Sequence, residues 1–160
     1  MKQGTTLFLR AAVILIGIPA LAIYVFIVPL IAKFAVELYP DMTYLRYLVF
    51  IDLYATAIPF YAALYQAFKL LSYIDKSKAF SELSVRALKN IKYCAILFSS
   101  LFAAGMPLFY LIAEKDDAPG VIVIGLVMIF ASLVIAVFAA VLQRLLEEAI
   151  AIKSENDLTI

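Results

Sequence analysis

The chain is 160 residues long, 66% of these residues are hydrophobic, and its mean hydropathy is +1.04. An ordinary soluble domain is only about 45–50% apolar, so the composition excludes a water-soluble globular protein. The formal net charge is +1, which lacks the basic excess expected of a protein that binds nucleic acid directly.

Residue usage also excludes several kinds of chemistry. The chain has no histidine and a single cysteine, Cys94. It therefore lacks the commonest metal ligand, the commonest general base and any intrachain disulfide. We expect Cys94 to pack as a small hydrophobic residue. We predict no metal site, no cofactor, no catalytic residue and no enzymatic activity.

Four long apolar stretches dominate the sequence, and they cover residues 11–32, 45–68, 91–113 and 118–142. Each approaches or exceeds the ~20 residues with which an α-helix crosses ~30 Å of hydrocarbon. We predict an all-α polytopic membrane protein with one domain, residues 1–160. Its four transmembrane helices are expected to form an antiparallel bundle, with a cytoplasmic loop at 69–90 and a cytoplasmic tail at 143–160.

The first predicted helix begins after Lys2 and Arg10. These residues and the following apolar run imitate a secretory signal, but the run continues well beyond the small residues at 20–22, which favours an uncleaved helix. Pro19 and Pro29 lie within the run. Because helix breakers survive in lipid only where neighbouring groups satisfy the freed carbonyls, we expect this helix to be bent.

The second predicted helix carries aromatic residues at intervals of seven, with further large residues between them. The set is Tyr47, Ile51, Tyr54, Ile58, Tyr61, Tyr65 and Phe68. This spacing predicts a seam that packs against a neighbouring helix. Lining of a cavity is the alternative.

Asp52 is the one formal charge well inside a predicted span. A carboxylate at that depth costs a few kcal/mol, so it is expected to face the bundle interior and to have a partner. The candidate hydrogen-bond partners are Tyr24, Tyr54 and Thr56, and the candidate counter-charges are Lys33 and Arg46. Asp52 is either a proton- or cation-responsive group, or a carboxyl near the outer interface that hydrates or pairs with Lys33.

The loop at 69–90 leads into a predicted short amphipathic helix before the third span. Ser81 is its predicted N-cap, and Phe80 and Val85 are placed as a hydrophobic staple. Leu83, Ala87, Leu88 and Ile91 share its apolar face. The cations expected to contact a partner or lipid headgroups are Lys76, Lys78, Arg86, Lys89 and Lys92. The alternative is that they only enforce topology.

The fourth predicted span contains a line of small residues, Ser132, Ala136 and Ala140, which allows two helices to approach closely. The short turn after the third span makes these two helices neighbours, so we expect the line to pack within the chain. A dimer face is the alternative. The tail is expected to stay helical to about Ile152 and then to fray.

The distribution of basic residues predicts the orientation. Lys33, Arg46 and Lys115 lie on one side, and the other ten of the 13 lysines and arginines lie on the opposite side. Because cytoplasmic segments are enriched in lysine and arginine, we expect both termini and the 69–90 loop to be cytoplasmic.

Three segments resemble a known family: YQAFKLL at 65–71, AFSE at 79–82 and DDAPG at 116–120. They are similar to the YoaS-like family of small bacterial four-helix membrane proteins, a domain of unknown function, and the resemblance covers nearly the whole chain. It implies a place in the bacterial cytoplasmic (inner) membrane, but no site residues. Members are often encoded beside a small helix-turn-helix regulator of the Cro/C1 type, which implies such a regulator as a candidate partner.

Two functions fit these features. The first is a regulatory or interaction protein in the bilayer that engages a cytoplasmic partner through its basic loop and tail. The alternative is an oligomeric small transporter or channel that uses Asp52 as a proton- or cation-responsive group. Either hypothesis allows the chain to form a homo-oligomer.

Overall fold

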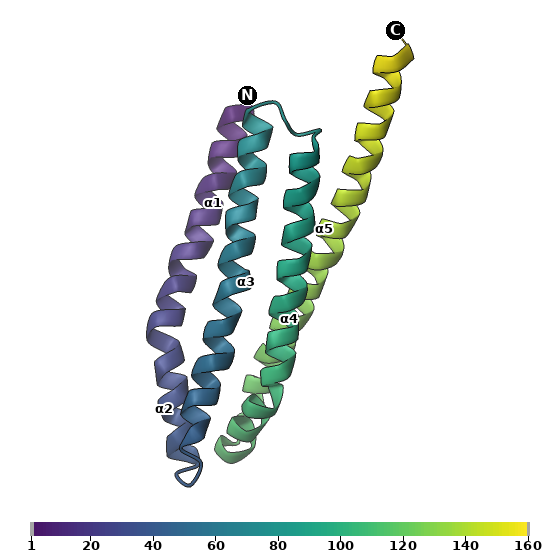
Figure 1. Cartoon of the computed structure of the whole chain (residues 1–160). Helices are drawn as coiled ribbons and strands as arrows, with labels where there is room; N and C mark the ends of the chain where they lie inside the picture. The colour runs from purple at the N-terminus through teal and green to yellow at the C-terminus, as the bar shows by residue number, and fades with distance from the viewer. Residues whose placement is uncertain (1, 160) are drawn as a thin grey trace.

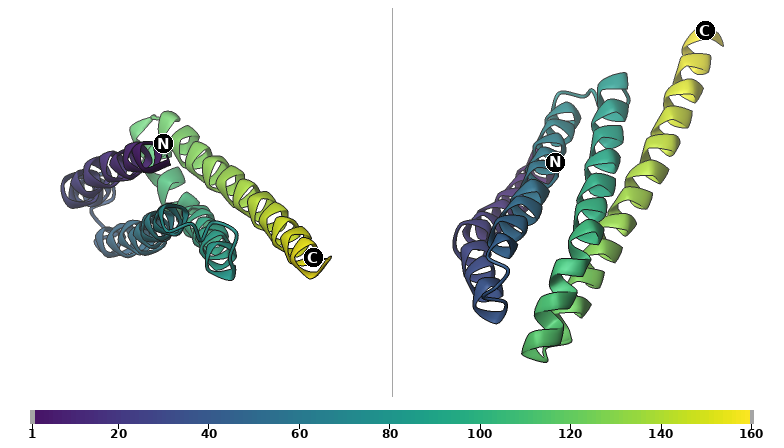
Figure 2. Two further views of the ribbon diagram at one scale, coloured as in Figure 1. Left: turned by 90° about the horizontal axis from the view of Figure 1, so that it is seen from above. Right: turned by 60° about the horizontal axis from the view of Figure 1, so that its bottom comes forward.

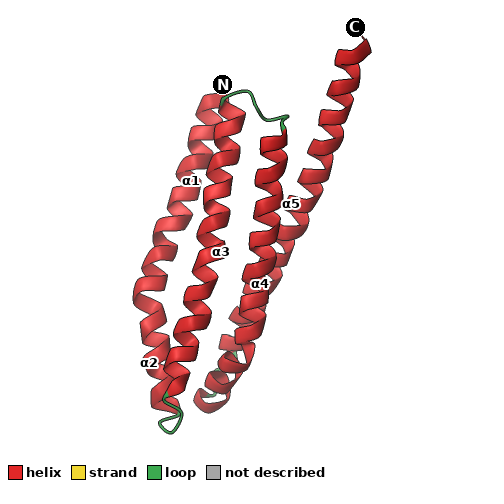
Figure 3. Ribbon diagram, viewed as in Figure 1, coloured by secondary structure: helices red, strands yellow, loops and turns green. Residues whose placement is uncertain are grey.

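The computed structural model describes residues 2–159, and within them every regular element is a helix (Figure 3). The elements are α1 Lys2–Ala22, the π-helix η1 Ile23–Ile27, α2 Val28–Leu38, α3 Tyr44–Asp75, α4 Glu82–Asp116 and α5 Gly120–Thr159. The predicted all-α class is confirmed.

Among the described residues, four helical segments are long and apolar enough to cross a membrane: Gly4–Leu38, Tyr44–Asp75, Glu82–Asp116 and Gly120–Asn156. The prediction of four helices long and apolar enough to cross a membrane is therefore confirmed, and each continues as helix beyond its apolar run. Residues 82–90, the segment expected to form a short amphipathic helix, are helical and form the first turns of α4.

The first span changes helical register where its prolines predict a bend. Pro29 lacks an N–H, so the carbonyl of Val25 has no α-helical donor four residues later. The chain responds with one π-helical turn, in which the N–H of Val28 donates to the carbonyl of Ile23. Such single turns often occur at functional positions in helices, and this one carries Tyr24.

The four spans form an open row. α1 and α2 pack against α3, α3 packs against α4, and α4 packs against α5, with a smaller contact between α2 and α4. Within residues 2–159, α5 contacts neither α1 nor α2. Figure 2 shows α5 crossing away from the other helices toward its C-terminus. The four helices of the predicted bundle therefore have an open arrangement.

The core lies between α2, α3 and α4. A ladder of phenylalanine rings runs along it, and the ring centroids are 6.2 Å apart for Phe60 and Phe98, 4.9 Å for Phe98 and Phe102, and 6.1 Å for Phe102 and Phe109. Leu45, Val49 and Leu53 complete the α3 side of the core, and Ala32 and Ala35 let α2 approach it closely.

The seam predicted on the second helix packs against a neighbour only in part: the Tyr61 hydroxyl donates to the carbonyl of Gly17 on α1 at 2.8 Å, and its ring lies 6.3 Å from that of Tyr24. Tyr47, Ile51 and Ile58 are 59%, 68% and 73% exposed, and the buried face of α3 is the one that carries Val49, Leu53 and Thr56. The prediction is wrong for these exposed residues because lipid is as apolar as a helix interface, so an apolar stripe does not distinguish the two. These exposed side chains lie on the outer surface of the molecule.

The small residues of α5 pack within the chain, as predicted. Ser132 and Ala136 are buried, and Ala139 is buried beside them, while Ala140 is only half-buried. Because α5 contacts α4 alone among the described helices, this face is the α4–α5 interface. The Ser99 hydroxyl of α4 reaches across it to the carbonyl of Ile129 at 3.5 Å.

The tail is helical to Thr159, so the expected fraying after Ile152 is wrong. At 1.5 Å per residue, the segment 143–159 adds about 25 Å of helix beyond the predicted fourth span. Figure 1 shows its end standing clear of the other helices, at the end of the molecule that also carries the N-terminus and the α3–α4 loop. We call residues 143–159 the α5 extension.

Candidate functional site

Asp52 lies on the face of α3 that meets α4. Its carboxylate packs so closely against Gly105 that a β-carbon at position 105 would overlap it. The side chain as a whole is half-buried, and its Oδ2 atom is buried without a hydrogen-bond partner among the described residues. Asp52 therefore faces the interior as expected, while glycine provides the space that the carboxylate occupies.

The predicted hydrogen-bond partners of Asp52 bond elsewhere. The Tyr24 hydroxyl lies 2.8 Å from Thr56 Oγ1, and the Thr56 hydroxyl donates to the carbonyl of Leu53 at 2.6 Å. Thr56 is completely buried. Since its single hydrogen is used on the carbonyl, Tyr24 acts as donor in the bond between the two hydroxyls. This link joins the π turn of the first span to α3.

Tyr54, the third predicted partner, belongs to an aromatic group. Its ring stacks on Phe50 at 5.6 Å and lies 6.4 Å from the ring of Tyr24. The sequence therefore identified three residues that do cluster, since Tyr24, Tyr54 and Thr56 are neighbours. The prediction that they surround Asp52 is wrong, because the Tyr24 and Thr56 hydroxyls bond to each other and to the Leu53 carbonyl, and Tyr54 makes ring contacts.

The predicted counter-charges do not pair with Asp52. Within the described chain, no ion pair joins Asp52 to Lys33 or Arg46. Arg46 instead places its guanidinium 5.2 Å from the ring centroid of Tyr47, and Lys33 lines a shallow hollow on α2 together with Glu37. The hypothesis that Asp52 pairs with Lys33 is therefore wrong.

The α3–α4 loop is held in one shape by its own hydrogen bonds. Ser77 has a left-handed backbone (φ 59°), and the N–H of Lys78 donates to the carbonyl of Tyr73 at 2.7 Å. The hydroxyls of Ser81 and Ser84 both donate to the carbonyl of Lys78, at 2.5 and 3.0 Å. The backbone that carries Lys76 and Lys78 is therefore fixed.

Ser81 is the N-cap residue of α4, as predicted, but its side chain does not cap the helix. Its carbonyl accepts from the N–H groups of Ser84 and Val85, while its hydroxyl is used in the loop. The proposed staple is also absent, because Phe80 is 57% exposed. The buried face of these turns is formed by Ser84, Val85, Ala87 and Leu88, whereas Leu83, expected on that face, is exposed.

The predicted cations occupy two different environments. Lys76, Lys78, Arg86 and Lys89 are exposed, and we call these four residues the basic patch. Lys92 is half-buried, with its ammonium 4.8 Å from the ring centroid of Tyr93. Lys69 has a similar contact with Tyr65 at 5.3 Å. Lys92 therefore belongs with the lysine–tyrosine pairs rather than with the free cations.

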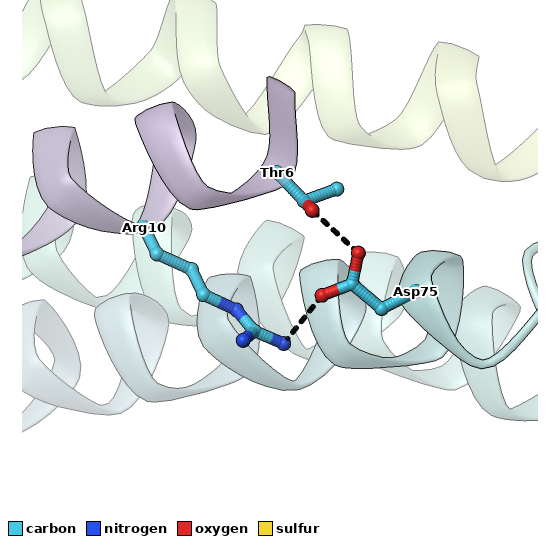
Figure 4. Close-up of polar contacts among 3 residues, drawn as sticks. All are labelled: Thr6, Arg10 and Asp75. Atoms are coloured by element: carbon cyan, nitrogen blue, oxygen red, sulfur yellow. Dashed lines mark hydrogen bonds and ion pairs between the residues drawn. The ribbon is translucent and has the colours of Figure 1, made fainter. Parts of the chain in front are cut away.

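A polar cluster that sequence reasoning missed joins the start of α1 to the end of α3 (Figure 4). The Arg10 guanidinium lies 2.9 Å from Asp75 Oδ2, and the Thr6 hydroxyl donates to Asp75 Oδ1. Thr6 is buried, and both charged side chains are partly buried. Arg10 had been interpreted only as a topology signal.

A pattern in the sequence could have revealed this cluster. Arg10 and Asp75 lie at similar distances along the chain from the turn near Asp41, so a helical hairpin closed at that turn brings them together. The cluster fixes the last turn of α3, and with it the point where the loop bearing Lys76 and Lys78 begins.

The described residues contain no group of three or more cysteine, aspartate or glutamate side chains placed to hold a metal ion. The candidate polar sites among the described residues are thus the Asp52–Gly105 contact, the Tyr24–Thr56 link, the Thr6–Arg10–Asp75 cluster and the basic patch. None of these pairs a nucleophile with a base.

Comparison with known proteins places the chain among membrane proteins without assigned function. A family described as "Protein of unknown function (DUF2975)" matches residues 30–160. The chain is 71% identical to the "Uncharacterized membrane protein YoaS" of Bacillus subtilis (strain 168) over 160 residues, which is the full length of both. No solved structure matches it.

Proposed function

This chain belongs to the DUF2975 family, a family of unknown function, and from that premise we propose that it is a membrane-anchored interaction protein. It engages a cytoplasmic partner through the basic patch and the α5 extension. The molecule is a membrane protein with four candidate spans. Its partner, its regulatory role and its orientation are parts of the proposal.

The fixed shape of the α3–α4 loop carries the proposal. The patch contains four exposed cations within 14 residues. On a flexible segment, binding through them would cost conformational entropy, because each residue would have to be ordered. Here the hydrogen bonds around Lys78 and the cluster at Asp75 have already ordered the backbone. A preorganised cationic surface suits recognition of an acidic partner surface.

The α5 extension supplies a second element at the same end of the molecule (Figure 1). It exposes Leu145, Ile152 and Leu158 on a helix that also carries charged residues. A helix that projects beyond the rest of the fold has no neighbour of its own to cover these side chains. In our proposal the partner covers them while it contacts the basic patch.

Orientation follows from the same residues. We take consecutive spans to be antiparallel and the end that carries the N-terminus, the loop and the α5 extension to be cytoplasmic, in the bacterial inner membrane. The excess of lysine and arginine at that end supports this orientation, and the lysine–tyrosine pairs at Lys69 and Lys92 suit a membrane interface. The family resemblance points to a helix-turn-helix regulator as the partner.

The proposal is tested by retrieving the tagged full-length chain from its source cells in mild detergent. Wild type is expected to retain a soluble protein in stoichiometric amount. A variant with Lys76, Lys78, Arg86 and Lys89 changed to Gln is expected to lose it. The matched control changes Lys33, Arg46 and Lys115, which lie toward the opposite end, and is expected to retain it. Equal retention by both variants would contradict the proposal.

Transport through an oligomer is the second candidate, and one observation favours it: Asp52 keeps a buried carboxylate oxygen without a partner. An intramembrane carboxylate is commonly part of an ion or proton path. Proton and cation flux in vesicles containing wild type and Asp52→Asn tests this candidate. Flux that disappears in Asp52→Asn would establish it, and equal flux in wild type, variant and empty vesicles would remove it.

A further inference from the structure

An apolar groove separates the first span from α5. Ile23 and Phe34 line it from the side of the first span, Ile124 and Met128 line it from α5, and Phe60 and Phe102 of α3 and α4 form its floor. Its volume is about 400 Å³, within the ~300–1,000 Å³ of typical ligand sites. Within residues 2–159 the backbone of α5 does not approach that of α1 or α2, so the groove lies between two spans that are not packed helix against helix.

The polar atoms of the groove wall are already used. Tyr24 and Thr56 both line the groove, but their hydroxyls bond to each other and to the Leu53 carbonyl. The wall therefore presents an aromatic ring and a methyl group rather than free donors. An occupant of this groove is selected by its hydrocarbon surface.

Charge lies beside the groove at the end that carries the α2–α3 turn. A shallow hollow of about 440 Å³ shares Ile31 and Phe34 with the groove, and Lys33 and Glu37 line it. Both charged side chains are exposed. An ammonium group binds phosphate as a point charge, and the neighbouring carboxylate disfavours a second negative charge. The pair therefore suits a zwitterionic headgroup.

We propose that the groove binds one acyl chain of a membrane phospholipid, whose phosphate lies at Lys33. The space between two spans whose backbones stay apart is not left empty, because protein interiors are packed to a density close to that of organic crystals. In a bilayer this space is filled by the acyl chains of lipids. The adjoining Lys33 and Glu37 have the charges that suit the zwitterionic headgroup of the same lipid molecule. This inference requires neither the proposed partner nor the proposed orientation.

The absence of tryptophan from the chain makes a direct test straightforward. Phe34→Trp places the fluorophore in the groove. Val123→Trp places it on a lipid-facing position of α5, also near the end with the α2–α3 turn but outside the groove lining. Each purified variant is titrated in detergent with phosphatidylcholine brominated in its acyl chains, and quenching is followed.

Quenching at Phe34→Trp is expected to saturate near one lipid per chain, while quenching at Val123→Trp rises only in proportion to the lipid in the micelle. Adding Ala20→Phe, which fills the groove from α1, is expected to abolish the saturable component. Lys33→Gln is expected to raise the half-saturating concentration by about twofold to fivefold, the range of an exposed ion pair.

Parallel, unsaturated quenching at the two positions would overturn the proposal. So would saturable quenching that is unaffected by Ala20→Phe. A dimer in which quenching at Phe34→Trp is absent would assign the groove to a helix of a second copy and would equally overturn it. Gel filtration and circular dichroism of each variant confirm that it is folded.

Discussion

The carboxylate of Asp52 occupies the space that a side chain at residue 105 would fill. Gly105 is therefore the position on α4 that admits the one charged group well inside the predicted spans. The contact joins α3 to α4 beside the phenylalanine core. The Asp52 carboxylate can occupy this position only if residue 105 has no side chain. A helix interface in lipid relies on such small residues, since apolar burial does not hold helices together there.

The first prediction concerns this contact. Gly105→Ala is expected to lower stability by about 1–3 kcal/mol, because the added methyl group displaces the carboxylate from a packed interface. Thermal unfolding in detergent measures the effect. Gly120→Ala is the matched control, since a β-carbon there meets nothing within 4 Å. Combining Gly105→Ala with Asp52→Ala is expected to recover most of the loss, and strictly additive losses would contradict the account.

The second prediction concerns the Thr6–Arg10–Asp75 cluster. A double-mutant cycle of Arg10→Gln and Asp75→Asn is expected to give a coupling energy of about 0.5–1 kcal/mol, as for a partly exposed ion pair. The coupling is expected to shrink in high salt, because ions screen the pair. Arg46→Gln, whose guanidinium contacts Tyr47, serves as the control. A coupling energy of zero at low salt would show that the pair does not hold α1 to α3.

The third prediction concerns the link between the π turn and α3. Tyr24→Phe is expected to cost about 0.6 kcal/mol, the average for a hydrogen bond between membrane helices. Thr56→Val is expected to cost more, because it leaves the Tyr24 hydroxyl without its acceptor. Tyr54→Phe, on a more exposed ring, is expected to be neutral. If Tyr24→Phe lowers stability more than Thr56→Val, this description of the link is wrong.

The fourth prediction concerns orientation. In a Cys94→Ser background, Lys78→Cys is expected to resist a membrane-impermeant maleimide in intact cells and to react after the cells are opened. Asp41→Cys is expected to react in both conditions, because Asp41 belongs to the α2–α3 turn, and that turn lies at the opposite end of the molecule (Figure 1). The reverse pattern would place the basic patch outside the cytoplasm and would rule out a cytoplasmic partner at that surface.

The number and place of the spans follow from the sequence, because the cost of burying polar groups in hydrocarbon acts on each helix separately. Which face of a span meets another helix does not follow so simply. Tyr47, Ile51 and Ile58 are as apolar as a packed seam, yet they are exposed. The small residues were better guides, since Ser132 and Ala136 do form the α4–α5 interface.

The candidate site was predicted in part. Asp52 was recognised as a residue that requires a partner, because a carboxylate in a span must be satisfied, and Tyr24, Tyr54 and Thr56 were predicted as its partners. Tyr24 and Thr56 bond to each other and to the Leu53 carbonyl, Tyr54 packs on Phe50, and the Asp52 carboxylate packs against Gly105. These choices depend on the π turn at Ile23–Ile27, and a sequence that shows only a proline does not reveal where the register shifts.

The central claim is that the basic patch is a recognition surface for a cytoplasmic partner. The most direct measurement is quantitative mass spectrometry of proteins retained from source cells by wild type, by the variant with Gln at Lys76, Lys78, Arg86 and Lys89, and by the variant with Gln at Lys33, Arg46 and Lys115. The account predicts one soluble protein near equimolar ratio with wild type and the second variant, and its loss with the first. Retention of that protein by the first variant, or a wild-type chain that retains only copies of itself, would contradict the account.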